Sequence, residues 1–193
     1  GECARLGHAH KALYCFEKMQ REQVLLNDVT LVCVLQACSA TGSLELCRNL
    51  HFSIVSAGCD LNPALVTTLI HAYGNCASMA DAQAFFDKIL GYDVVSWNAI
   101  IAGYSQHGLS RNALQYFHGM VQQGWKPNAS TYTSILGACN RACEVEQALC
   151  HFVSMTEDYG LRPTVEHFDC VIDLLGRAGL LEEADRLLQS IPP

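Results

Sequence analysis

Short polar side chains recur along this chain at fixed places in a repeating pattern. One series, the helix row, contains Val32, Thr67, Asn98, Thr133 and Asp169. A second series, the turn row, contains Asn27, Asn62, Asp93, Asn128 and Thr164. Hydroxyl, amide and carboxylate groups are hydrogen-bond donors, acceptors or both. One residue from each row could therefore recognise one hydrogen-bonding group of a ligand.

The elements that must position these residues are helices. The stretch Val94–Asn128 contains two amphipathic segments, and three apolar columns repeat its pattern through the chain. Successive members are separated by 35, 35, 31, 35 and 36 residues wherever they are present. The columns are Ala12, Cys47, Ala82, Ala113, Ala148 and Ala184; Met19, Ile54, Ile89, Met120, Met155 and Ile191; and Leu35, Ile70, Ile101, Leu136 and Ile172. One helical hairpin cannot bury its own apolar face, so this register predicts an all-α solenoid of stacked hairpins.

The register also predicts the repeat units. They are a partial unit over 1–27, whole units over 28–62, 63–93, 94–128 and 129–164, and a truncated unit over 165–193. Within 94–128, we expect Gly108 to end the first helix and Ser110 to cap the second. Neither end of the array has the polar cap that a solenoid terminus usually carries, so we expect the chain to be cut at both ends.

The turn row has a second interpretation, since Asn, Asp and Thr before a helix are ordinary N-caps. The helix row is harder to explain by local structure. Its residues lie one turn into the first helix of each unit, where Thr, Asn and Asp are mediocre helix formers. Helical packing gives no reason for variable polar residues among fixed apolar ones. Together the two rows favour ligand recognition on the concave face.

Two further rows lie on the same helices. The arginine row contains Arg5, Ala40, Asn75, Gln106, Arg141 and Arg177. It has no acidic member, and Arg141 and Arg177 suit contact with phosphate groups, although scattered surface charge would look the same. The flanking row contains Val29, Ala64, Val95, Ser130 and Glu166. Small or apolar residues such as Val29 and Val95 could sandwich a flat ring between units, whereas Glu166 fits that role poorly.

Composition narrows the remaining classes of function. The net charge of −7, from 12 Lys and Arg against 19 Asp and Glu, disfavours a generic nucleic-acid binder. The 11 cysteines recur at packing positions and include no Cys-x-x-Cys, so we expect them to be reduced, mostly buried and free of metal. Cys47 and His51 are one turn apart, but no second pair completes a metal site. We expect no catalytic site, no cofactor and no membrane span.

The units resemble pentatricopeptide repeats of the plant type that mixes long, short and standard motifs. VVSWNAIIAGYSQHG is similar to the standard motif, LVCVLQACSATGSLE to the long one and LVTTLIHAYGNCASMADAQAFFDKI to the short one. TVEHFDCVIDLLGRAGLLEEADRLLQSIP resembles the last short motif of organelle RNA-editing factors. Ala77 and Cys143 depart from the pattern, because a helix-ending glycine is usual there.

The resemblance implies sequence-specific binding of single-stranded RNA, one base per repeat. It assigns Thr67 with Asp93 to guanine, and Asn98 with Asn128 to a pyrimidine, cytosine preferred. It also implies a specificity factor for C-to-U editing in a mitochondrion or chloroplast. Deamination would come from a missing domain or a partner in trans, since the zinc motifs His-x-Glu and Pro-Cys-x-x-Cys do not occur. A targeting peptide is not expected within this piece.

Three alternatives remain. Tetratricopeptide repeats hold a period of about 34 residues, which the 31, 35 and 36 spacings disfavour. A scaffold that binds a peptide on its concave face agrees with the net acidity but leaves the polar rows unexplained. A metalloenzyme has the least support.

Overall fold

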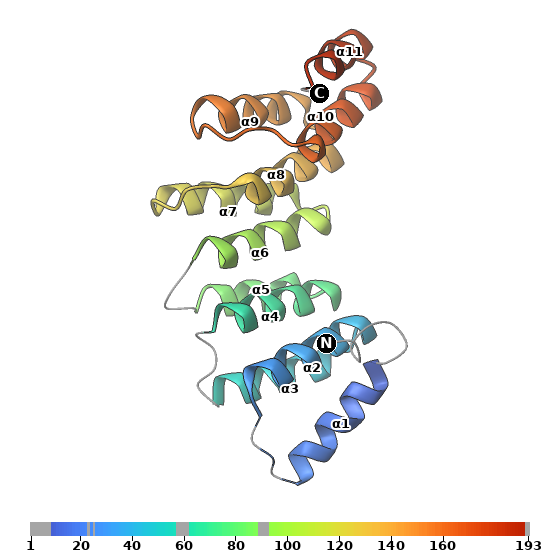
Figure 1. The fold of residues 1–193 in the computed structure, drawn as a ribbon, viewed down its shortest axis with the longest axis vertical. Coiled ribbons are helices and arrows are strands. Elements are labelled where there is room, and N and C mark those ends of the chain that lie inside the picture. Colours follow the sequence, from blue (N-terminus) through green and yellow to red (C-terminus); the bar gives the residue numbers. More distant parts are fainter. Residues whose placement is uncertain (1–8, 23, 25, 57–61, 89–92, 192–193) are drawn as a thin grey trace. The chain divides into compact units, whose positions relative to one another are not determined.

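The structure is a computed structural model that describes residues 9–22, 24, 26–56, 62–88 and 93–191. Every regular element in those ranges is a helix (Figure 1). The helices are α1 Ala9–Arg21, α2 Asp28–Thr41, α3 Leu44–Ser56, α4 Pro63–Asn75, α5 Met79–Phe86, α6 Val94–Gln106, α7 Ser110–Gln122, α8 Ala129–Ala142, α9 Val145–Glu157, α10 Val165–Arg177 and α11 Leu181–Gln189. None of the helices in the described ranges is both long and apolar enough to span a membrane.

The chain divides into two compact units, Gly1–Ile100 and Ile101–Pro193, with the division inside α6. In the first unit α2 packs against α1, α3 and α4, and α4 packs against α5. In the second, α8 packs against α7, α9 and α10, and α10 packs against α9 and α11. Within each unit, therefore, the first helix of one hairpin lies beside the first helix of the next.

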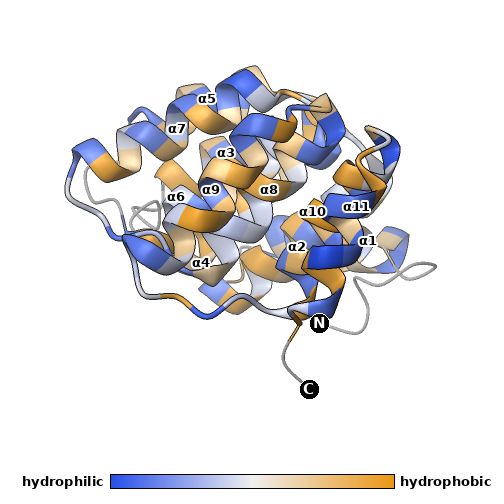
Figure 2. Cartoon of the chain, turned by 90° about the horizontal axis from the view of Figure 1, so that it is seen from above, coloured by the Kyte–Doolittle hydropathy of each residue, from blue (hydrophilic) through white to orange (hydrophobic). Residues whose placement is uncertain are grey.

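The apolar columns form the cores of both units. The helices show alternating hydrophobic and hydrophilic bands in Figure 2, as expected when one side of each helix is buried. The middle members of the columns are almost entirely inaccessible to solvent, whereas Ala12, Met19, Ile172, Ala184 and Ile191 near the ends are half-buried. Ile89 lies outside the described residues. The buried members are Leu35, Cys47, Ile54, Ile70, Ala82, Ile101, Ala113, Met120, Leu136, Ala148 and Met155.

Short left-handed turns join the helices of a hairpin. Gly108 has φ +71°, as expected for a residue that ends a helix. Ala77 and Cys143, at the equivalent places, adopt φ +55° and +58° although they carry a Cβ atom. The backbone hydrogen bond that closes the turn is present at both positions. After Ala77, the Ser78 N–H donates to the Tyr73 carbonyl at 2.9 Å, and after Cys143, the Glu144 N–H donates to the Cys139 carbonyl at 3.0 Å. The turn conformation is thus kept without glycine, at some cost in backbone strain.

The expected cap of α7 is wrong. Ser110 is the first residue of the helix and Leu109 is the N-cap, with no side-chain hydrogen bond. The physical reason is the length of the turn. Leu109 N–H already closes the preceding turn on the Tyr104 carbonyl, while the Leu109 carbonyl accepts the first bond of α7 from Ala113.

The expectation that the cysteines are mostly buried is also wrong in part. Cys38, Cys47 and Cys139 are buried, Cys33, Cys76 and Cys170 are half-buried, and Cys15, Cys143 and Cys150 are exposed. The exposed ones lie on outer helix sides or in a turn, where the apolar register does not apply. Burial raises the pKa of Cys38 and Cys47 to about 12 and that of Cys139 to about 11. Cys3 and Cys59 lie outside the described residues.

Candidate nucleic-acid interface

All members of the turn row lie directly before the first helix of a hairpin. Oδ1 of Asn27, Asn62 and Asn128 accepts backbone N–H groups of α2, α4 and α8 respectively. The capping interpretation is therefore correct for these three residues, whereas the side chain of Thr164 makes no such bond to the backbone of α10. Capping uses one polar atom of each side chain, and an amide or carboxylate has a second polar atom.

Asp93 shows how the two uses combine. Its Oδ1 accepts the backbone N–H of Ser96 at 2.7 Å and the Ser96 hydroxyl at 2.6 Å. No donor in the described part of the chain bonds to Oδ2. The half-buried Asp93 thus has one oxygen that caps α6 and a second that is available as an acceptor.

Asn62 is held differently. Its Oδ1 accepts N–H groups of Ala64 at 2.9 Å and Leu65 at 3.4 Å, and its Nδ2 donates to Oδ2 of Asp28 at 2.5 Å. Asp28 lies at the start of α2, 34 residues earlier. Both polar atoms of this amide therefore have partners within the protein.

The helix row is accessible to solvent. Val32, Thr67, Asn98 and Thr133 are half-buried and Asp169 is exposed. The hydroxyl of Thr67 donates to the Pro63 carbonyl one turn earlier at 2.9 Å. Since that bond uses the hydroxyl proton, Thr67 retains acceptor capacity.

His167 connects the two rows at the start of α10. Its Nδ1 accepts the Thr164 N–H at 2.9 Å and lies 2.7 Å from the Thr164 hydroxyl. A backbone N–H can only donate, so the proton of the neutral ring is on Nε2. Nε2 lies 2.9 Å from the Ala129 carbonyl and 3.1 Å from Oγ1 of Thr133. One buried ring thus contacts both polar residues of the unit 129–164, a role that the sequence analysis did not assign.

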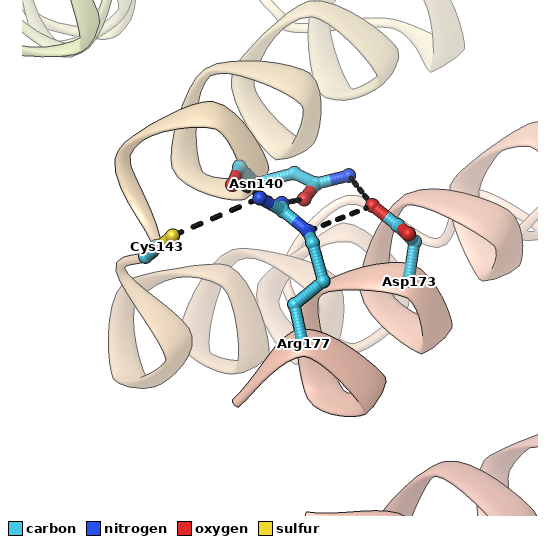
Figure 3. Close-up of polar contacts among 4 residues, drawn as sticks. All are labelled: Asn140, Cys143, Asp173 and Arg177. Carbon is cyan, nitrogen blue, oxygen red and sulfur yellow. Dashed lines mark hydrogen bonds and ion pairs between the residues drawn. The ribbon is translucent and has the colours of Figure 1, made fainter. Parts of the chain in front are cut away.

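Three members of the arginine row, Asn75, Arg141 and Arg177, form bonds to the preceding hairpin. Arg141 donates from Nε to the Ser105 carbonyl at 2.7 Å, and Asn75 donates to the Ser39 hydroxyl. Arg177 of α10 reaches Asn140 near the end of α8 (Figure 3), with Nη2 2.5 Å from the Asn140 carbonyl. These bonds span 36, 36 and 37 residues.

Arg177 has a second set of partners on its own helix. Its Nε donates to Oδ2 of Asp173 at 3.2 Å, and the same oxygen accepts Nδ2 of Asn140 at 3.0 Å (Figure 3). Ala40 and Gln106 of the arginine row are exposed, and Arg5 lies outside the described residues. Contact of Arg141 and Arg177 with phosphate stays a prediction, and the structure shows that both side chains also join neighbouring helices.

The flanking row is accessible throughout. Val29 is 71% exposed and Val95 52% exposed, and Ala64, Ser130 and Glu166 are also exposed. Apolar side chains so open to water on the first helical turn are available to pack against a ligand.

The possible half-site formed by Cys47 and His51 is occupied by other contacts. Cys47 is buried, and His51 Nδ1 is 2.7 Å from the hydroxyl of Tyr73. Across the described ranges, no cluster of three or more His, Cys, Asp or Glu side chains is arranged to hold a metal ion.

Comparison with known families agrees with this geometry. The profile described as "PPR repeat family" matches residues 92–141, "Pentatricopeptide repeat domain" matches 117–178, and "PPR repeat" matches 2–24 and 166–192. The chain belongs to the pentatricopeptide repeat family. The alternative that the units are tetratricopeptide repeats is therefore rejected.

Two plant relatives show how much of a pentatricopeptide repeat protein this chain represents. The protein CRR2, chloroplastic, of Arabidopsis thaliana is 38% identical over 190 residues, which cover 97% of this chain and 29% of the relative. A mitochondrial pentatricopeptide repeat-containing protein of the same plant is 35% identical over 189 residues, covering 98% and 34%. The chain therefore spans about a third or less of these relatives.

Solved structures show the same fold. The pentatricopeptide repeat protein PPR10 from maize matches 99% of this chain and 28% of its own, with a TM-score of 0.80 at 20% identity. A second structure of PPR10, in complex with an 18-nt psaJ RNA element, matches 97% of this chain with a TM-score of 0.76. The expected fold class, an all-α solenoid of helical hairpins, is confirmed.

Proposed function

We propose that this chain binds single-stranded RNA sequence-specifically, with one helix-row residue and one turn-row residue reading each nucleotide. The observation that carries the proposal is the pair Thr67 and Asp93. Both are half-buried, Thr67 keeps acceptor capacity, and Oδ2 of Asp93 lacks a donor within the described residues. The likeness in fold to a protein solved with an RNA element supports this reading.

We propose that the units run as expected from the sequence, over 1–27, 28–62, 63–93, 94–128, 129–164 and 165–193. Helices α2, α4, α6, α8 and α10 begin at residues 28, 63, 94, 129 and 165, which supports these boundaries. The order of long, short and standard units supports membership of the plant group that mixes them.

The parent protein would be a specificity factor for C-to-U editing in a mitochondrion or chloroplast. The support is the likeness to chloroplastic and mitochondrial relatives, together with the similarity of 164–192 to the last motif of editing factors. Deaminase chemistry would come from another domain or a partner, and this chain would supply recognition without catalysis.

The chemistry of the pair Thr67 and Asp93 favours guanine. A carboxylate oxygen only accepts hydrogen bonds, and guanine has N–H donors on its Watson–Crick edge. Adenine has an acceptor at N1, which a carboxylate repels. An amide in place of the carboxylate would keep one capping oxygen and replace the other with a donor.

The test is a fluorescence titration of the parent protein against four RNAs that differ only at the nucleotide assigned to 63–93. The wild type should prefer G, and Asp93→Asn should prefer A, with a wrong base costing about 1–3 kcal/mol. Asp and Asn are both good N-caps, so stability should change little. Asn128→Asp serves as the matched control, because it should alter only the next nucleotide.

An unchanged ranking in Asp93→Asn would refute base reading by the turn row. The peptide scaffold, which the net charge of −7 favours, would then be tested next with peptide libraries on the same parent.

A further inference from the structure

Residues at the third position of α2, α6 and α8 fix the turn-row residue that precedes each helix. In all three cases the backbone N–H and the hydroxyl of one residue donate to the same oxygen. Thr30 binds Oδ1 of Asn27 at 2.8 and 2.9 Å, and Thr131 binds Oδ1 of Asn128 at 3.1 Å with both groups. Ser96 binds Oδ1 of Asp93 at 2.7 and 2.6 Å.

These paired donors determine which atom of the turn-row side chain is bonded to the start of the helix. A backbone N–H can only donate, so the atom facing it must be an oxygen, and the flip of an asparagine amide is thereby settled. The other atom of the group is then Nδ2 in asparagine and Oδ2 in aspartate. With one donor alone, the group can rotate about its terminal torsion, which has a broad distribution of angles.

We propose that Ser96 is a positioning residue for base recognition, making Oδ2 of Asp93 the atom that discriminates guanine from adenine. The proposal rests on the proposed function. Ser96 is only 2% exposed, so it has almost no surface with which to touch RNA itself. Its hydroxyl acts through Asp93: by bonding to one of the two equivalent carboxylate oxygens, it restricts rotation of the group and so fixes the direction of the other oxygen.

The unit 28–62 provides an internal contrast. Leu65 stands at the third position of α4 and has no hydroxyl to offer Asn62. The amide of Asn62 instead takes a second anchor from Asp28, which accepts its Nδ2. Where the hydroxyl is lacking, the nitrogen that would face a base is already bonded within the protein.

The experiment measures base discrimination by the parent protein with the four RNAs that differ at the nucleotide assigned to Asp93. Ser96→Ala should reduce the ratio of affinities for G and A about three- to tenfold, the worth of one hydrogen bond. Ser96→Thr should restore the ratio, because threonine forms the same bonds at Thr30 and Thr131. Discrimination at the neighbouring nucleotide should stay unchanged in both variants.

A second variant keeps the test decisive if Ser96→Ala unfolds. Thr131→Val preserves the shape of the side chain and removes only its hydroxyl, so it should weaken discrimination at the nucleotide read by Asn128 and not at the preceding one. Circular dichroism would verify that each variant is folded.

The outcomes separate the two proposals. If Ser96→Ala and Thr131→Val weaken binding to all four RNAs equally, the hydroxyls stabilise the helix start alone and the inference is overturned. If Asp93→Asn also leaves the ranking unchanged, the proposed function fails as well. A shifted preference in Asp93→Asn with an intact ratio in Ser96→Ala would overturn only the positioning role.

Discussion

The guanidinium of Arg141 holds Ser105, a residue that lies 36 positions earlier in the chain. Nε donates to the Ser105 carbonyl at 2.7 Å and Nη2 to the Ser105 hydroxyl at 2.5 Å. Ser105 is buried, and its hydroxyl in turn donates to the Ser134 carbonyl at 2.6 Å. Gly137 leaves room for this arrangement, since a Cβ atom there would lie 3.2 Å from Nη2 of Arg141. The end of α6 and the helix α8 are thus joined by an arginine.

Arg141→Lys separates this structural role from phosphate contact. Lysine keeps the positive charge but cannot form the bidentate hydrogen bond to Ser105, so the free energy of unfolding should fall by about 1 kcal/mol. Urea unfolding of wild type and Arg141→Lys would measure the change. Full stability in the lysine variant would contradict the structural role.

RNA titrations over a range of salt complete this test. Arg141→Ala should weaken binding to every sequence alike and lower the salt slope by about 1 if the residue also contacts phosphate, whereas Arg141→Lys should keep the slope. An unchanged slope in Arg141→Ala would leave only the structural role.

The burial of apolar side chains predicts that truncating a side chain in the middle of the array lowers the free energy of unfolding more than truncating one near its end. Ile101 is fully buried, and Ile101→Ala should reduce the free energy of unfolding by about 2–5 kcal/mol. Leu188 of α11 is 55% exposed, so Leu188→Ala should cost less than about 1 kcal/mol. Denaturant melts of both variants make the comparison. Equal losses would contradict the packing described for the two residues.

The cysteines should fall into distinct classes of reactivity. Cys38 and Cys47, whose burial raises the pKa to about 12, should resist iodoacetamide at pH 7.5 until the protein unfolds. Cys15, Cys143 and Cys150 are exposed and should react in the native state. Mass spectrometry of peptides after timed alkylation would measure each site. Early labelling of Cys47 would show that the core is less closed than the structure indicates.

His151 should make stability depend on pH. Burial lowers the pKa of His151, and the nearby His118 lowers it further. Around and below pH 6.5 the unfolded chain then binds more protons than the folded one, so the free energy of unfolding should decrease as the pH falls. Urea unfolding at pH 7.5, 6.5 and 5.5 should show the decrease, and His151→Gln should reduce it. His107→Gln, at an exposed position, is the matched control and should leave the decrease in place.

Periodicity predicted the helices well because packing of the apolar columns is a local pattern repeated along the chain. The family resemblance marked Ala77 and Cys143 as places where a helix-ending glycine is usual, and both residues adopt the left-handed conformation. Capping preference failed at Ser110, where turn length overrides it. The expectation of buried cysteines failed at the exposed Cys143 and Cys150, which follow no buried register.

The site was predicted less completely. Ser105, the partner of Arg141, is 36 residues away, and no sequence pattern within one unit predicts a bond over that separation. The roles of Ser96 and His167 did have a local signal, because each lies three residues after a turn-row residue, at the place a capping box uses. That spacing could have revealed them from the sequence.

The bond between Ser96 and Asp93 has a consequence for protein engineering and for evolution by repeat exchange. Asp93 is the last residue of the proposed unit 63–93, yet the hydroxyl that bonds to it belongs to the next proposed unit. Under the proposed function, a graft cut after the turn-row residue would transfer the base-reading atom without the hydroxyl that positions it. The residue at the third helical position of the recipient would then be a hydroxyl-bearing residue or a leucine such as Leu65. Segments exchanged with their boundary after the third residue of the following helix would keep the turn-row residue and the hydroxyl that bonds to it together. Duplication or recombination at this boundary, rather than at the end of the unit, would then preserve the proposed base specificity of a unit in its new position.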